Sequence, residues 1–242
     1  MDMKKSALRK EFYREIRGSL QRFLSILLIS ALGAAFFAGL RACKTDMLLS
    51  ADAFYDSTNM MDLRIVSSMG LTQDDVRAIC AADGVRAAEG VFVQDALFSD
   101  GDEDVVVRLY SMTEQVNTCL LTGGRMPQGV SECAADEYFL SARGLKLGDT
   151  LQLESGSGDG LSDTLRKTQV TIVGSVSTGR YLSSARGSST IGNGKVAGYL
   201  VLPAENIIPE YYTEIGVLFE GTRELNSYGD EYDAVVEQCM EA

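Results

Sequence analysis

The sequence between residues 23 and 40 reads Phe23-Leu-Ser-Ile-Leu-Leu-Ile-Ser-Ala-Leu-Gly-Ala-Ala-Phe-Phe-Ala-Gly-Leu40 and contains no charged side chain. Arg22 and Arg41 stand at its two ends. At about 1.5 Å per residue, a helix of this length spans roughly 27 Å, which is close to the thickness of the hydrocarbon core of a bilayer. A core helix of a soluble protein would carry a polar stripe, whereas this segment offers only two serines. The segment therefore predicts a transmembrane helix over residues 22–41.

The distribution of charge predicts which side of the membrane each part occupies. Residues 1–22 carry seven Lys and Arg against three Asp and Glu, which leaves 15 basic and 31 acidic residues for the rest of the chain. Lys and Arg close to a span stay on the cytoplasmic side, while a long domain is translocated largely regardless of its charge. We expect a cytoplasmic N-terminus and an extracytoplasmic main domain. An acidic domain also argues against nucleic acid as a partner, because phosphate binding needs a basic surface.

Two other interpretations of the apolar segment remain open. A cleaved signal peptide has a shorter apolar run, of about 7–15 residues, and a shorter basic region before it. The sequence Leu40-Arg-Ala-Cys43 has the outline of a lipoprotein processing site, in which Cys43 would carry the lipid. Arg41 inside that site is a poor fit to an enzyme that works within the membrane, so a retained anchor is the better interpretation.

The residues on either side of the span predict helices as well. Before the span, apolar residues recur every fourth position between Lys and Arg, which is typical of an amphipathic helix in the headgroup layer over residues 1–21. The apolar face consists of Leu8, Phe12, Ile16 and Leu20. After the span, helical periodicity continues through Met47 and Phe54 to about Asn59. This pattern predicts that the membrane helix extends outward as a stalk over residues 42–59.

The remainder of the chain predicts an α+β fold of short strands and helices. An alternating strand over residues 62–67 is followed by Thr72 with Asp74 and Asp75, which is typical of a helix start. Two strands then flank an acidic turn at residues 100–104, and this strand–helix–strand–strand order suggests stacked α and β layers. Further on we expect a short helix over 136–144, a helix near 224–240 and strands at 150–153, 168–176, 198–202 and 214–219.

Candidate catalytic and ligand-binding motifs in the sequence do not meet their own requirements. The chain contains no His, which excludes Ser-His-Asp triads and zinc sites built on His. Gly192-Asn-Gly-Lys195 lacks the earlier Gly and the following Ser or Thr of a phosphate-binding loop, and the Gly156-x-Gly-x-Gly160 spacing does not fit a dinucleotide site. Asp100, Asp102 and Asp104 alternate like calcium ligands, but Val105 replaces the glycine of that loop. We therefore expect no enzymatic activity, no cofactor and no metal site.

The five cysteines do not define a disulfide framework. They stand at positions 43, 80, 119, 133 and 239, their number is odd and no two form a CxxC pair. An exported domain could pair some of them, but spacing alone leaves the connectivity open. Cys80 follows a helical pattern that places it on a buried face.

Several short motifs occur in a characteristic order along the whole chain. Residues 22–33 and 36–39 lie in the span, Met61–Ile65 follows the stalk, and Gly123–Pro127, Glu132–Asp136, Gly144–Asp149, Thr171–Gly174, Ile191–Lys195 and Glu224–Tyr228 come later. Their order resembles the N-terminal part of an FtsX-like ABC-transporter permease with a MacB-like extracytoplasmic core domain. The motif positions that carry this resemblance are Gly124, Arg125, Pro127, Glu132, Gly148, Asp149, Gly174, Gly192, Gly194 and Lys195.

The resemblance implies a non-catalytic permease subunit of four spans with a large outer domain between the first two. It implies a mixed α+β part formed by residues 60–115 and 205–242, with a mostly β part inserted over residues 116–204. It also implies a separate cytoplasmic ATPase as partner, and contacts with membrane lipid and with further permease spans or a second permease copy. The outer domain of such a permease converts motion of the spans into export or relay of a substrate.

A different class of protein is also compatible with the sequence. A self-sufficient anchored ectodomain, such as an adhesion, binding or signalling module, would share the span and the acidic domain. A pilin-like subunit would need a glutamate early in its apolar helix, and residues 25–38 contain none. The resemblance favours the permease, which predicts that this chain is only the N-terminal part of one.

Overall fold

A computed structural model describes residues 11, 14, 17–101, 103–156 and 160–241. The chain divides into two compact units, Met1–Ser50 and Ala51–Ala242. Three of the four expected face residues of the N-terminal amphipathic helix, Leu8, Phe12 and Ile16, lie outside the described residues.

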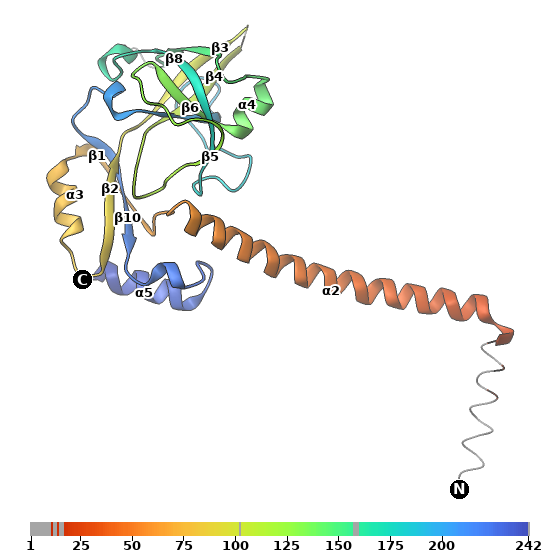
Figure 1. The fold of residues 1–242 in the computed structure, drawn as a ribbon. Coiled ribbons are helices and arrows are strands. Elements are labelled where there is room, and N and C mark those ends of the chain that lie inside the picture. The colour runs from red at the N-terminus through yellow and green to blue at the C-terminus, as the bar shows by residue number, and fades with distance from the viewer. Residues whose placement is uncertain (1–10, 12–13, 15–16, 102, 157–159, 242) are drawn as a thin grey trace. The chain divides into compact units, whose positions relative to one another are not determined.

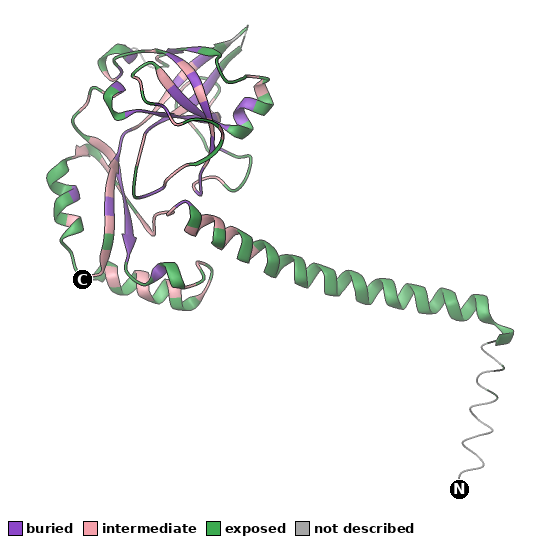
Figure 2. Cartoon of the chain, viewed as in Figure 1, coloured by how far each residue is buried: buried purple, intermediate pink, exposed green. Residues whose placement is uncertain are grey.

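One long helix, α2, runs from Leu20 to Ser57 without interruption (Figure 1). It includes all of the expected helical span and residues 42–57 of the expected stalk, which confirms that the helix continues beyond Arg41. No residue of α2 is buried, and Figure 2 shows its surface as exposed along almost its whole length. The helix ends where Asn59 adopts a left-handed backbone with φ 45°, and the Thr58 hydroxyl donates to the carbonyls of Phe54 and Tyr55.

After α2 the chain builds a small antiparallel sheet covered by helices. The sheet has the order β1 (Leu63–Leu71), β10 (Tyr212–Phe219) and β2 (Val85–Val91). Helix α3 (Gln73–Cys80) connects β1 to β2 and begins with the expected start signal, since Thr72 and Asp75 form a reciprocal capping box. Side chains from the sheet, from α3 and from helix α5 (Asp230–Glu241) form one apolar cluster. This part of the second unit thus combines strands and helices, and we use the name outer domain for residues 51–242.

The remaining strands form a second, larger sheet that closes on itself. The strands are β3 (Val93–Asp100), β4 (Glu103–Ser111), β5 (Leu120–Gly124), β6 (Glu132–Asp136), β7 (Thr150–Glu154), β8 (Gln169–Ser177) and β9 (Val196–Leu202). They pair in the order β5-β8-β6-β9-β4-β3-β7, and β7 pairs back to β8. Six strands thus form a closed barrel. Strand β5 lies outside this ring and pairs with the second half of β8, whose first half pairs with β7. Helix α4 (Glu137–Arg143) follows β6, and three 3₁₀ turns lie at Leu161–Asp163, Ala204–Asn206 and Thr222–Glu224.

The barrel interior contains the main hydrophobic core. Alternate residues of β8 are buried, as the period of a strand requires. Ile172, Leu200 and Leu109 are completely buried in this core together with Phe139 of α4. Gly198 of β9 has no side chain where the Phe139 ring lies, because a Cβ there would overlap the ring. This close approach of Phe139 to Gly198 packs α4 directly against the barrel.

The structure differs from the sequence expectations in three places. Residues 93–111 were expected in the mixed part over 60–115, but β3 and β4 belong to the barrel, because β4 pairs with β9 in parallel. Cys80 is exposed rather than buried, since it is the last residue of α3, and its thiol lies at the edge of the sheet, 3.6 Å from the carbonyl oxygen of Ala88. The C-terminal helix begins at Asp230 rather than near Glu224, because residues 222–229 form a 3₁₀ turn and a loop.

Candidate functional site

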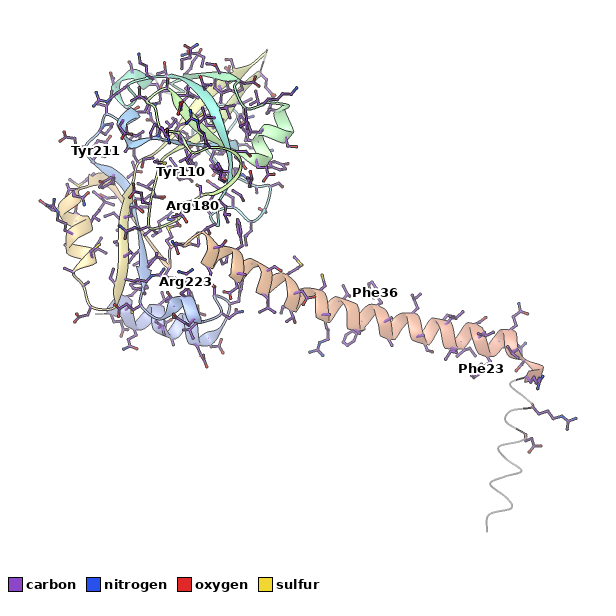
Figure 3. The ribbon with its side chains drawn as sticks, viewed as in Figure 1. Phe23, Phe36, Tyr110, Arg180, Tyr211 and Arg223 are labelled. Atoms are coloured by element: carbon purple, nitrogen blue, oxygen red, sulfur yellow. The ribbon has the colours of Figure 1, made fainter. Side chains whose placement is uncertain are left out.

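The first candidate site is the apolar surface of α2. Ile29, Leu32 and Phe36 are 72%, 71% and 68% exposed, and large apolar side chains are exposed on every side of the helix. Figure 3 shows Phe23 and Phe36 projecting outward from α2. Within the described residues this helix is the one candidate for a membrane span, by length and composition. Exposed apolar surface of this extent is costly in water and favourable in a bilayer.

The second candidate site is the end of α2, where the helix joins the outer domain. The Asp52 carboxylate accepts hydrogen bonds from the backbone N–H and the hydroxyl of Ser227, both at 2.7 Å. One turn later, the Tyr228 hydroxyl lies 3.3 Å from that of Tyr55, and the two rings lie 6.2 Å apart. Partial burial and the contact with Tyr228 raise the pKa of Tyr55 to about 12. The loop before α5 therefore binds the last two turns of α2.

Asp62, just beyond the helix, continues this attachment into the three-stranded sheet. Its carboxylate accepts hydrogen bonds from the backbone N–H of Phe219 at 2.7 Å, from the hydroxyl of Thr222 at 2.9 Å and from that of Tyr232 at 2.7 Å. Burial and the bond to Asp62 raise the pKa of the Tyr232 hydroxyl. A cavity of about 270 Å³ lies beside these groups. One carboxylate thus ties the helix end to β10, to the turn after it and to α5.

A loop that follows β8 also contacts the end of α2. Thr58 is completely buried, and a Cβ at Gly179 would lie 2.5 Å from its hydroxyl oxygen. Next to this contact, Arg180 forms a buried ion pair with Glu214 of β10 at 2.6 Å. The guanidinium of Arg180 also lies 5.0 Å from the centre of the Tyr110 ring (Figure 3). The loop therefore links the end of α2 to both sheets of the outer domain.

The same loop is held to the barrel by a second buried ion pair. Arg186 binds Asp136 through two hydrogen bonds of 2.6 and 3.0 Å, and both side chains are almost fully buried. The guanidinium packs over the rings of Tyr138, Tyr181 and Tyr199 at 5.1–5.9 Å. Desolvation acts to lower the pKa of Arg186, but the bond and charge of Asp136 raise it, and the net shift is upward. Bidentate pairing and satisfied donors allow these charges to remain inside the domain.

The first group of predicted motif positions forms a turn between β5 and β6. The Arg125 guanidinium lies 2.5 Å from the Glu132 carboxylate, which also accepts the backbone N–H groups of residues 128 and 129 at 2.9 and 3.2 Å. These bonds, with that of Arg125 first, lower the pKa of Glu132 to about 2. Gly124 and Gly174 face each other across β5 and β8, where a Cβ on either would overlap the opposite backbone. Pro127 lies within the turn itself.

The other motif positions also have local structural roles. Gly148 has a φ of 97°, and the Asp149 carboxylate accepts the N–H of Lys146 at 2.7 Å, so both shape the turn before β7. Gly192 and Gly194 have left-handed backbones, and the N–H of Lys195 donates to the Asn193 side chain at 3.0 Å. Because the N–H groups of 194 and 195 are bonded within the turn, they are not directed at a phosphate.

Sequence reasoning did not find the residues that make the junction. Asp52, Arg180, Glu214 and Arg186 carry no local signal, because their partners lie 34 to 175 residues away along the chain. Asp136 could have been recognised as a helix cap, since it accepts the N–H of Tyr138. Within the described residues no group of three or more acidic or cysteine side chains is arranged to hold a metal ion. All five cysteines are free thiols in the structure.

No family model and no curated protein matches this chain. Solved structures with a similar arrangement include the extracellular domain of the ABC-type transporter YknZ from Gram-positive bacteria, at 13% identity and a TM-score of 0.40 over 73% of this chain and 87% of that one.

Two further solved structures give similar values. The periplasmic region of MacB from Actinobacillus actinomycetemcomitans is 14% identical, with a TM-score of 0.39 over 73% of this chain and 75% of that one. A domain of a protein assigned as a permease from Porphyromonas gingivalis is 15% identical, with a TM-score of 0.37 over 71% and 77%.

Proposed function

We propose that this chain is the first membrane span and the extracytoplasmic domain of an ABC-transporter permease, without enzymatic activity of its own. The observation that carries the proposal is the continuity of α2. Its first half is exposed and apolar, its last turns are hydrogen-bonded to the outer domain, and both belong to a single helix. The basic residues before the span favour a cytoplasmic N-terminus. A separate ATPase and the remaining spans of the permease, or a second copy of it, would be the partners.

In this proposal α2 acts as a lever between the membrane and the outer domain. A helix with unbroken backbone hydrogen bonds transmits a tilt or shift as a rigid element. The contacts of Asp52, Thr58 and Asp62 supply the points at which such a motion enters the outer domain. The ion pair of Arg180 with Glu214 then joins the two sheets, so that a displacement of one sheet would move the other.

Membrane topology provides the first test. The starting variant has its other four cysteines replaced and keeps only the buried Cys133. Into it we would introduce a single new cysteine, either Arg17→Cys before the span or Lys146→Cys at an exposed position of the outer domain. Burial raises the pKa of Cys133 to about 12, so this thiol should not react. A membrane-impermeant maleimide added to intact cells should label the second variant and not the first. Labelling of Lys146→Cys only after the cytoplasm is opened would refute the topology.

The lever itself is tested by breaking the helix between its two ends. Seven Gly and Ser residues inserted after Ser50 in the complete permease should uncouple ATP hydrolysis by the partner ATPase from export. Seven Ala-rich residues at the same place keep the segment helical. Because seven residues make nearly two turns, the two halves of the helix also keep their relative rotation, so this insertion should preserve coupling better. Equal export by both insertions would count against the lever and favour an anchored module that works without it.

A further inference from the structure

A second cavity of the outer domain lies between the three-stranded sheet and the barrel. Its volume is about 490 Å³, within the range of small-molecule sites. One wall consists of the start of α3 and of β2, with Gln73, Ala88 and Gly90. The opposite wall consists of the end of β4 and of the segment from Ala204 to Tyr212. We call this cavity the inter-sheet cleft.

The inter-sheet cleft presents aromatic and apolar groups on one side. Phe92 and Tyr211 lie edge to face with their ring centres 6.1 Å apart. Phe92 is buried, whereas Tyr211 is 45% exposed and is available to a ligand (Figure 3). Met112, Ile207 and Pro209 complete this apolar side.

The charge of the cleft has a single sign. Its charged lining residues are Glu89, Glu114 and Glu210, and no Lys or Arg lines it. The Glu89 carboxylate is held by three backbone N–H groups, of residues 114, 115 and 116, at 2.9–3.0 Å. In the part of the chain that the structure describes, none of the three carboxylates forms an ion pair. The cavity beside the helix end is different, since Arg86 and Arg223 balance its two aspartates.

We propose that the inter-sheet cleft binds an amphipathic organic cation, with a protonated or quaternary amine attached to an apolar body. The carboxylates attract the amine, the exposed ring of Tyr211 offers its negative face to the same charge, and the apolar side accepts the body of the ligand. The cleft lies wholly within the outer domain, so this proposal requires neither the membrane orientation nor the partner ATPase of the proposed function.

Ligand-observed NMR on the full chain in detergent tests the proposal. Benzyltrimethylammonium is the probe, and benzenesulfonate is an aromatic anion of comparable size. We expect saturable transfer of magnetisation to the cation and none to the anion. Replacing Glu114→Gln and Glu210→Gln together should weaken binding by about two- to fivefold per charge, as for exposed ion pairs. Neither side chain forms a hydrogen bond within the described residues, so the variant should fold.

Two further variants separate the cleft from general attraction to an acidic protein. Tyr211→Ala should weaken binding of the cation by about two- to fivefold through loss of the ring. Glu220→Gln removes an exposed charge that does not line the cleft and should leave binding unchanged. Equal binding of both probe ions, or equal loss with Glu220→Gln, would overturn the proposal. Binding of a Lys-containing peptide without binding of benzyltrimethylammonium would also overturn it and assign the cleft to a protein partner.

Discussion

Ile29 of α2 is 72% exposed, whereas Ile172 of β8 is completely buried in the barrel. Both side chains are equally apolar, and each gains about 1.5–3 kcal/mol when it leaves water. In the barrel, strands and α4 pack around Ile172, whereas no residue of α2 is buried and Ile29 remains exposed within the part of the chain that the structure describes. The same apolar chemistry therefore stabilises the fold in one region and makes the other region a candidate membrane span.

The largest effect should come from placing the same charge in each region. Ile29→Asp costs about 4 kcal/mol at the centre of a span, so much of the chain should leave the membrane fraction. Ile172→Asp should instead unfold the barrel while the chain stays in the membrane. Alkaline extraction of membranes measures the first effect, and protease resistance of the outer domain measures the second. If the Ile29→Asp variant still resisted alkaline extraction, Ile29 would not lie at the centre of a membrane span, and the contrast with Ile172 would be wrong.

A smaller effect is expected from the buried ion pair of the barrel. Asp136→Asn keeps a side chain that can cap α4 but leaves Arg186 buried without its charged partner, which costs about 3–5 kcal/mol. The melting temperature of the outer domain should fall by roughly 10 °C. The matched change Asp74→Asn breaks the exposed pair with Arg77 and should cost less than about 0.5 kcal/mol.

The double variant Asp136→Asn/Arg186→Met completes this test. It removes the unpaired charge, so most of the lost stability should return. No recovery would mean that the tyrosine contacts of the Arg186 guanidinium matter more than its charge.

The smallest effect concerns the pH dependence of the turn after β5. The pKa of Glu132 is about 2 in the folded protein, below its ordinary value of 4.5, because Arg125 and two backbone N–H groups bind the carboxylate. A lowered folded pKa contributes stability that is complete above pH 4.5 and is lost as the pH falls toward 2. Glu132→Gln should therefore flatten the decline in thermal stability over this range. An unchanged profile would show that other carboxylates determine it.

The local features of this chain were predictable because their causes lie within a few residues. The apolar run predicts the long helix, Thr72 and Asp75 predict the start of α3, and Gly144, with a φ of 68°, ends α4 as expected. Closure of the barrel was not predictable, because β8 pairs with β7 and β5 along the same edge and each strand is compatible with several partners. For the same reason β3 and β4 were expected in the wrong part of the outer domain.

Local sequence alone specifies where an apolar helix forms and where turns require glycine, since length, hydropathy and backbone strain act over a few residues. Only folding of the whole domain brings Asp52 to Ser227, lets Arg180 join the two sheets and places three glutamates around one cleft. Those contacts depend on strand pairings between distant residues, whose energies are settled only when the whole core is packed.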